Sequence, residues 1–112
     1  MTGGHDNDLL QGLTGNDEMH GEDGNDHLAG GSGHDSLDGG ARSDALIGGQ
    51  GGHVPAGGHG SDALHGNDGS DVMTGGDGAD TFVYTYVGDE PIEITDFDPT
   101  VGGYDGHSVS RK

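Results

Sequence analysis

The feature that most constrains this chain is a nine-residue repeat. From Gly3 to Val83 the sequence divides into nine consecutive blocks of nine residues, with no insertion. Every block begins with glycine, eight of nine carry aspartate at the sixth position, and eight of nine carry Leu, Met or Phe at the eighth. Repetition at a fixed short period is typical of a solenoid, in which each unit buries its apolar side chain against neighbouring units.

Composition alone suggests weaker interpretations. With 27 glycines, 27% hydrophobic residues and a formal charge of −18, the chain resembles a disordered or collagen-like sequence. Collagen is excluded because the seventh position is never glycine and Pro is rare.

The composition also excludes several kinds of site and segment. No Cys is present for a disulfide or thiolate site, and no apolar run could span a membrane. The charge repels nucleic acids and anionic membranes and favours cations. Met1–Gly4 shows no basic or apolar stretch, so we expect no cleavable secretory signal.

The columns of the repeat predict an all-β fold. Glycines at positions one, two and four permit positive φ, so the first six positions can wrap as a tight loop. Positions seven to nine are the stretch suited to a strand, with position eight pointing inward. Two successive blocks then form one coil. We expect a parallel β-roll, a two-sheet β-solenoid with the apolar column between its sheets.

The sixth-position aspartates predict cation sites. Loops alternate sides, so aspartates two blocks apart stack at about the 4.8 Å spacing of strands. Two carboxylates at that distance repel by about 3–4 kcal/mol at an effective dielectric of 20. A solvated turn would explain one such aspartate but not a column. Calcium suits the column because it accepts carboxylate and carbonyl oxygens in loose geometry, whereas magnesium demands a strict octahedron. The predicted calcium ligands are Asp8, Asp17, Asp26, Asp35, Asp44, Asp62, Asp71 and Asp80.

The two predicted rows differ in continuity. The first row offers four sites between its five aspartates, Asp8, Asp26, Asp44, Asp62 and Asp80. In the second row His53 stands where aspartate is expected, which leaves the site between Asp17 and Asp35 undamaged, because histidine is a poor calcium ligand. Pro55 takes an inward strand position and Arg42 adds positive charge near an ion site. These departures predict a local bulge or seam at residues 48–56.

The pattern G-G-x-G-x-D-x-U-x, with U apolar, resembles the RTX (repeats-in-toxin, hemolysin-type) nonapeptide repeat over residues 3–83. The resemblance implies a calcium-binding β-roll. It also implies a secreted, extracellular bacterial protein of the type I secretion kind, in which a passenger domain can be fused to the array and the array folds on meeting extracellular calcium.

Residues 84–112 differ from the array and are expected to form a capping tail. Asp80–Tyr84 and Ile92–Pro99 are similar to the cap that follows RTX arrays, and Gly103–Ser110 is at best a degraded version of the strand that comes next. A cap would cover the apolar column at the end coil. The expected cap residues are Phe82, Tyr84, Val87, Ile92, Ile94 and Phe97.

The sequence shows no catalytic constellation. H-E-x-x-H and G-x-S-x-G are absent, and the eight histidines fall at scattered columns, most of them facing solvent. We therefore expect a non-catalytic module that binds several calcium ions and folds upon binding them. The alternative is a surface- or polysaccharide-recognition module of a secreted enzyme, adhesin or toxin.

Overall fold

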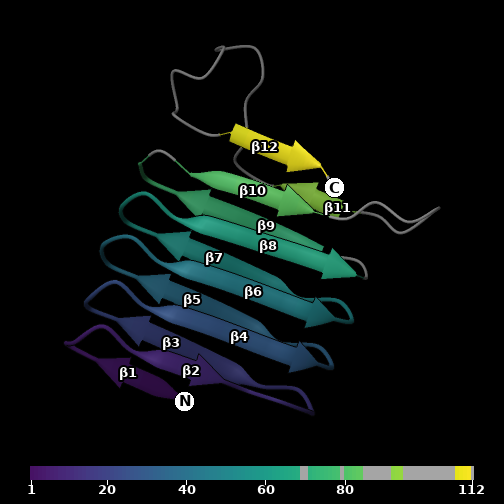
Figure 1. Cartoon of the computed structure of the whole chain (residues 1–112), viewed down its shortest axis with the longest axis horizontal. Coiled ribbons are helices and arrows are strands. Elements are labelled where there is room, and N and C mark those ends of the chain that lie inside the picture. Colours follow the sequence, from purple (N-terminus) through teal and green to yellow (C-terminus); the bar gives the residue numbers. More distant parts are fainter. Residues whose placement is uncertain (69–70, 79, 85–91, 95–107, 112) are drawn as a thin grey trace.

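The computed structural model of the chain describes residues 1–68, 71–78, 80–84, 92–94 and 108–111, which form strands joined by short turns. Two parallel six-stranded sheets face each other, and the chain passes from one to the other with each strand (Figure 1). None of the described segments is a helix long and apolar enough to cross a membrane.

The odd-numbered strands form one sheet in the order β1-β3-β5-β7-β9-β11, and the even-numbered strands form the other in the order β12-β10-β8-β6-β4-β2. The first sheet holds β1 (Thr2–Gly4), β3 (Glu18–Glu22), β5 (Ser36–Gly40), β7 (Val54–Gly58), β9 (Asp71–Gly76) and β11 (Ile92–Ile94). The second holds β2 (Leu9–Gln11), β4 (His27–Ser32), β6 (Ala45–Gln50), β8 (Ala63–Asp68), β10 (Thr81–Tyr84) and β12 (Ser108–Arg111).

The register between neighbouring strands of the array is constant and equals two nonapeptides. Leu28 pairs with Leu46, Leu46 with Leu64, and Leu64 with Phe82. A coil therefore consists of two repeats, as the nine-residue period predicts. The predicted all-β, parallel β-roll is confirmed.

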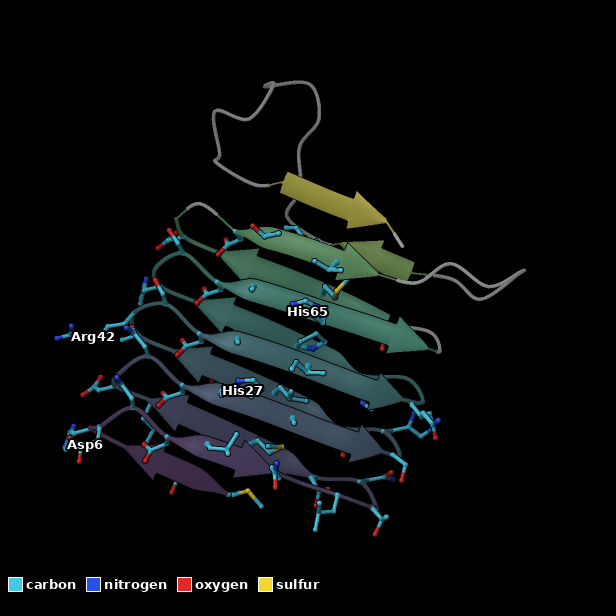
Figure 2. All side chains as sticks on the ribbon, viewed as in Figure 1. Asp6, His27, Arg42 and His65 are labelled. Atoms are coloured by element: carbon cyan, nitrogen blue, oxygen red, sulfur yellow. The ribbon has the colours of Figure 1, made fainter. Side chains whose placement is uncertain are left out.

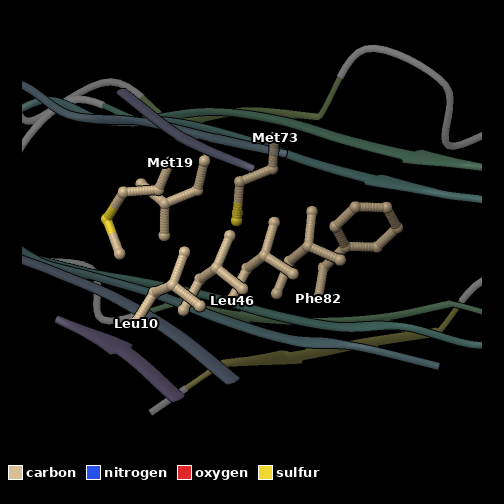
Figure 3. Close-up of a cluster of buried hydrophobic side chains, with 8 residues drawn as sticks. Leu10, Met19, Leu46, Met73 and Phe82 are labelled. Atoms are coloured by element: carbon tan, nitrogen blue, oxygen red, sulfur yellow. The ribbon is translucent and has the colours of Figure 1, made fainter. Parts of the chain in front are cut away.

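The core is one thin layer of side chains between the sheets, to which each sheet contributes one row (Figure 3). The eighth residue of every block is buried, and most are 0–1% exposed. Alternation along a strand explains this, because neighbours on either side of an inward residue must point outward. Glu18 and Asp38, which flank inward residues, are accordingly exposed. The core residues are Leu10, Met19, Leu28, Leu37, Leu46, Pro55, Leu64, Met73 and Phe82.

Two details of the repeat differ from the expectation. Strands such as β4 and β6 continue through the first three positions of the next block, so the turn occupies mainly positions four to six. Positive φ occurs at positions two and four but not at the glycine of position one. Leu13, Glu22 and Arg42 adopt positive φ without being glycine, which costs conformational energy at those turns.

A bulge or a seam is expected from the sequence at residues 48–56, and of these two the bulge is wrong. A seam is present on the β9 side, where the pairing of β7 with β9 begins only at Ala56. Leu37 pairs with Pro55 and Gly40 with Gly58, so the two-repeat register continues through the sixth block. Val54 donates its N–H to the Asp35 carbonyl, just before β5, at 2.9 Å. Because alternate residues of a parallel strand direct their N–H groups to opposite neighbours, the donor that Pro55 lacks belongs to the β9 side. The proline thus weakens one seam without shifting the strand.

The tail contributes one strand to each sheet. β11 pairs with β9 and β12 pairs with β10, both in parallel. Val87 and Phe97 lie outside the described residues, as does most of the stretch Gly103–Ser110. Phe82 is buried in the core. Tyr84, Ile92 and Ile94 lie on β10 and β11. A capping role for residues 84–112 stays a prediction.

Leu46→Ala should destabilise the calcium-saturated protein by about 2–5 kcal/mol, because it opens a cavity in a core that is one side chain thick. Leu9→Ala is the matched control, since Leu9 is 65% exposed, and its effect should stay within about 0.5 kcal/mol. Denaturant unfolding of both variants measures this. Equal losses would contradict a core confined to the eighth column.

Candidate metal centre

Each sixth-position aspartate sits where a turn enters a strand, and the coil stacks these residues into two rows. Asp26, for example, directly precedes β4, and Asp44 directly precedes β6. The carboxylates are turned inward: Asp26, Asp35, Asp44 and Asp62 are only 2–4% exposed, and Asp71 and Asp80 are at most 1% exposed. Asp8 and Asp17 belong to the first coil and are partly exposed. The other six are therefore buried acids, not solvated turn residues.

From the second coil onward, Oδ1 of each stacked aspartate accepts a hydrogen bond from a backbone N–H of the coil before it. The backbone N–H of Asp8 donates to Asp26 Oδ1 at 2.8 Å, and Asp26 donates in the same way to Asp44. Asp44 donates to Asp62 and Asp62 to Asp80, at 2.8 and 2.9 Å. This ladder of charge-assisted hydrogen bonds fixes each carboxylate in one orientation and couples it to its neighbour.

In the first row, the second carboxylate oxygen of Asp26, Asp44 and Asp62 has no donor in the described part of the chain. These three Oδ2 atoms are buried and lack a hydrogen-bond partner. Leaving a charged oxygen unpaired away from water costs more than leaving a neutral one unpaired. A row of such atoms is the arrangement that a bound cation would stabilise.

The first-position glycines leave the space in which these oxygens converge. A Cβ added to Gly3 would lie 2.6 Å from Asp8 Oδ2 and 2.8 Å from the carbonyl oxygen of Gly21, one coil further on. At Gly39 the corresponding distances are 2.6 Å to Asp44 Oδ2 and 2.7 Å to the Gly57 oxygen. Glycine is thus needed here for close approach, not for positive φ.

This donor set fits calcium. A carboxylate oxygen from one coil and a backbone carbonyl from the next face the same space, and calcium binds both oxygen types. Within the described residues, no three His, Cys, Asp or Glu side chains gather in a way that could hold a metal. Sites between two aspartates must therefore draw on backbone oxygens, which calcium accepts readily.

Burial also changes the acidity of the rows. It raises the pKa of Asp44 to about 6, with the neighbouring Asp26 carboxylate adding to the effect. It raises the pKa of Asp62 to about 7, where the charges of Asp80 and Asp44 act in the same direction. Both shifts show that ionised carboxylates are disfavoured in this row without a cation.

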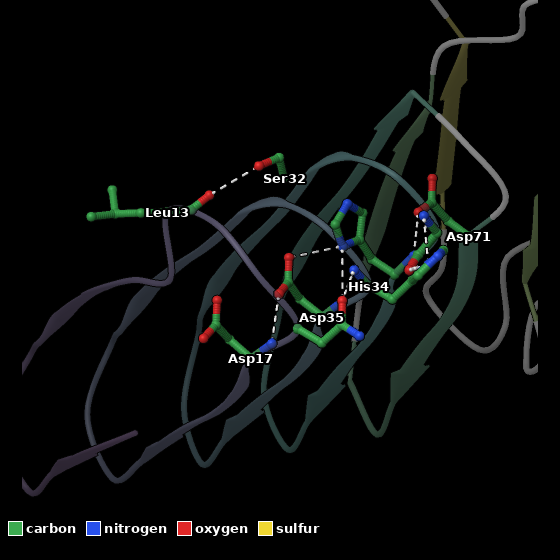
Figure 4. A network of polar contacts seen from close by, with 9 residues as sticks. Leu13, Asp17, Ser32, His34, Asp35 and Asp71 are labelled. Carbon is green, nitrogen blue, oxygen red and sulfur yellow. Dashed lines mark hydrogen bonds and ion pairs between the residues drawn. The ribbon is translucent and has the colours of Figure 1, made fainter.

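His53 interrupts the second row, whose members Asp17, Asp35 and Asp71 are labelled in Figure 4. Asp17 donates its N–H to Asp35 Oδ1 at 2.9 Å, and His53 donates its own to Asp71 Oδ1 at 2.9 Å. Between them, Asp35 donates to His53 Nδ1 over 3.3 Å. Burial lowers the pKa of His53, so the ring is neutral and supplies no positive charge in place of an ion.

Other charged groups of the described residues lie at exposed turns, apart from the rows. Figure 2 shows Arg42 projecting from the edge of the roll, so its charge points into solvent and not toward the carboxylates. His5 lies 2.9 Å from Asp23 and His59 lies 3.1 Å from Asp77, and each exposed pair joins equivalent turns of successive coils. Sequence reasoning missed these pairs, although the two-repeat coil could have revealed them.

The fold and the rows define the class of protein: a parallel β-roll with buried inter-coil carboxylates that suit calcium. A family model described as the RTX calcium-binding nonapeptide repeat (4 copies) matches residues 2–37 and 56–84, which is more than half of the chain. The chain belongs to this family and is a calcium-binding repeat module of the RTX type. Neither the curated proteins nor the solved structures contain a match.

Calcium affinity should depend on pH because two carboxylates of the first row have raised pKa values. The metal-free fold binds these protons more tightly than the unfolded chain does, so their stabilising effect is lost as pH rises through about 6 and 7. Calcium must displace the same protons below that range. We expect calcium to bind about tenfold more weakly at pH 6 than at pH 8, with protons released on binding. Calorimetry in buffers of different ionisation enthalpy measures both the calcium affinity and the number of protons released. A calcium affinity that does not change with pH would contradict the account.

Proposed function

We propose that the array is a calcium-dependent folding switch in which the eight sixth-position aspartates supply the side-chain ligands. The observation that carries this is the row of buried Oδ2 atoms without donors, best seen at Asp26, Asp44 and Asp62. Each faces a backbone carbonyl of the following coil across the space that a glycine leaves open.

The physical basis of the switch is electrostatic. Without calcium, folding would place ionised carboxylates one strand spacing apart and out of water, which is costly. The apolar column is only one side chain thick and offers limited compensation. An ion that binds the folded state alone stabilises it by mass action. Extracellular calcium modules bind at about 10⁻⁴–10⁻³ M, which suits a chain that meets calcium outside the cell.

The rows suggest how many ions bind. The first row has four intervals between its five aspartates, and each interval joins two successive coils on the same side. In the second row only the interval between Asp17 and Asp35 has a carboxylate from both coils before His53 intervenes. We assign calcium to these intervals.

The context of the module follows from its family. We propose that residues 3–83 are the calcium-binding β-roll and that residues 84–112 form its capping tail, of which β11 and β12 extend the two sheets. Membership of the RTX family supports a secreted, extracellular location, and it is compatible with a fused passenger domain. We assign the chain itself no catalytic role.

Recognition of a polysaccharide is the second candidate. A groove of about 420 Å³ lies at the starts of β4, β6, β8 and β10, and Asp26, Asp44 and Asp62 of the first row form part of its wall. Its lining includes Asn25, His27, Ser43, Ser61 and Thr81. A glycan array probed with calcium-saturated protein tests this role, and binding that needs the groove residues would establish it.

The switch predicts that calcium drives folding. In chelator the chain should give the circular dichroism of an unfolded polypeptide, and millimolar calcium should produce a β spectrum with a smaller hydrodynamic radius. Removing calcium again should reverse both. A chain equally ordered in chelator would contradict the proposal.

Asp44→Asn separates ligation from surface charge. Asparagine keeps the shape and the Oδ1 acceptor but removes the charge, so the calcium midpoint should rise at least about tenfold, because contacts to a charged group are worth about 1.5–3 kcal/mol. Asp38→Asn removes one charge from the exposed face of β5 and should leave the midpoint nearly unchanged. Equal shifts in the two variants would indicate general electrostatics rather than ligation.

A further inference from the structure

His53 places an imidazole inside a row that is otherwise made of carboxylates. Its side chain is completely buried, and so is that of Asp35 one coil earlier. His53 Nδ1 lies 3.2 Å from Asp35 Oδ2. His53 Nε2 is buried without a hydrogen-bond partner. His53 Nδ1 and Asp35 Oδ2, two potential ligand atoms, are thus held together away from water, where the other coils hold two carboxylates.

The orientation of the ring is set by the coil. The ring fills the place of a carboxylate, with Cδ2 2.6 Å from the Cβ that Gly48 would carry and Nδ1 turned toward Asp35. The hydrogen bond from the Asp35 N–H to Nδ1 is 3.3 Å, longer than the 2.8–2.9 Å found at the carboxylates. The nitrogen is therefore weakly engaged by the backbone.

The pair does not fit calcium, which takes oxygen ligands, but its chemistry fits a borderline transition metal. Zinc binds imidazole nitrogen and carboxylate oxygen at about 2.0–2.2 Å, so two ligands of a tetrahedral ion lie about 3.4 Å apart. The observed 3.2 Å is close to this separation. The Gly48 carbonyl faces the same space as Asp35 Oδ2, both near the Cβ position of Gly30. It offers a third donor, with water completing the shell.

We propose that Asp35 and His53 form a site for one divalent transition metal ion of the zinc type, set within the calcium-binding roll. This inference rests on the proposed function, because the site exists only in the folded, calcium-loaded array. In this site His53 Nδ1, the nitrogen beside Asp35 Oδ2, binds the metal, and Nε2 keeps the ring proton. The histidine at position 53, which stands where other blocks have aspartate, thereby replaces a calcium site of the second row with a site for a different metal.

Zinc chloride titrated calorimetrically into protein held in millimolar calcium tests the proposal. The native chain should show one tight zinc per molecule. His53→Asp restores the carboxylate of the other repeats, so it should fold, lose the tight zinc, and bind two further calcium ions, one on each side of residue 53. Asp35→Asn should weaken zinc by at least about 100-fold, since even indirect supports of a metal site are worth about 10–100-fold.

His59→Ser is the matched control. His59 and Asp77 also form a pair between successive coils, at 3.1 Å, but both side chains are about four-fifths exposed. The tight zinc should survive this change. Zinc binding that persists in His53→Asp, disappears in His59→Ser, or is absent from the native chain would overturn the inference. Calcium-driven folding is measured first by circular dichroism, so failure of the switch and failure of the zinc site give different results.

Discussion

Carboxylates buried one strand spacing apart are the constraint on which the whole structure depends. Asp26 and Asp44, for example, are buried, tie Oδ1 to the preceding coil, and leave Oδ2 facing a carbonyl of the next coil. At six of the nine block starts, Gly3, Gly12, Gly21, Gly30, Gly39 and Gly57, a Cβ would strike both a carboxylate oxygen and a carbonyl oxygen. The thin apolar column between the sheets holds the strands in register. In the proposed function, the acidic rows make the assembly of these strands depend on calcium.

The two rows are not equivalent, and the difference is concentrated in one stretch. The row from Asp8 to Asp80 is a continuous chain of N–H to carboxylate bonds, whereas the other row is broken by a neutral imidazole. The RTX family model matches the chain on both sides of residues 38–55 but not within them. That gap contains Arg42, His53 and Pro55, and yet the register runs through it unchanged. Backbone pairing therefore tolerates substitutions that interrupt the row of carboxylates.

Much of this fold could be predicted from the repeat. A nine-residue period with one inward residue fixes the coil length, the parallel register and the core. The rows of aspartates follow from the same two-repeat step. The role of the first glycine could not be predicted, because it depends on contacts with the carboxylate of its own block and the carbonyl of the next coil. The bulge expected at Pro55 did not form, because the lost donor faces only one neighbouring strand. The His–Asp pairs were missed because column by column they look like scattered surface residues.

Amide hydrogen exchange with and without calcium tests the central claim most directly. In saturating calcium, the backbone amides of Asp26, Asp44 and Asp62, which donate along the first row, should be among the most protected in the chain. In chelator these amides should exchange at the rate of an unfolded polypeptide. Strong protection of the same amides without any divalent cation would show that the rows fold on their own and would contradict the account.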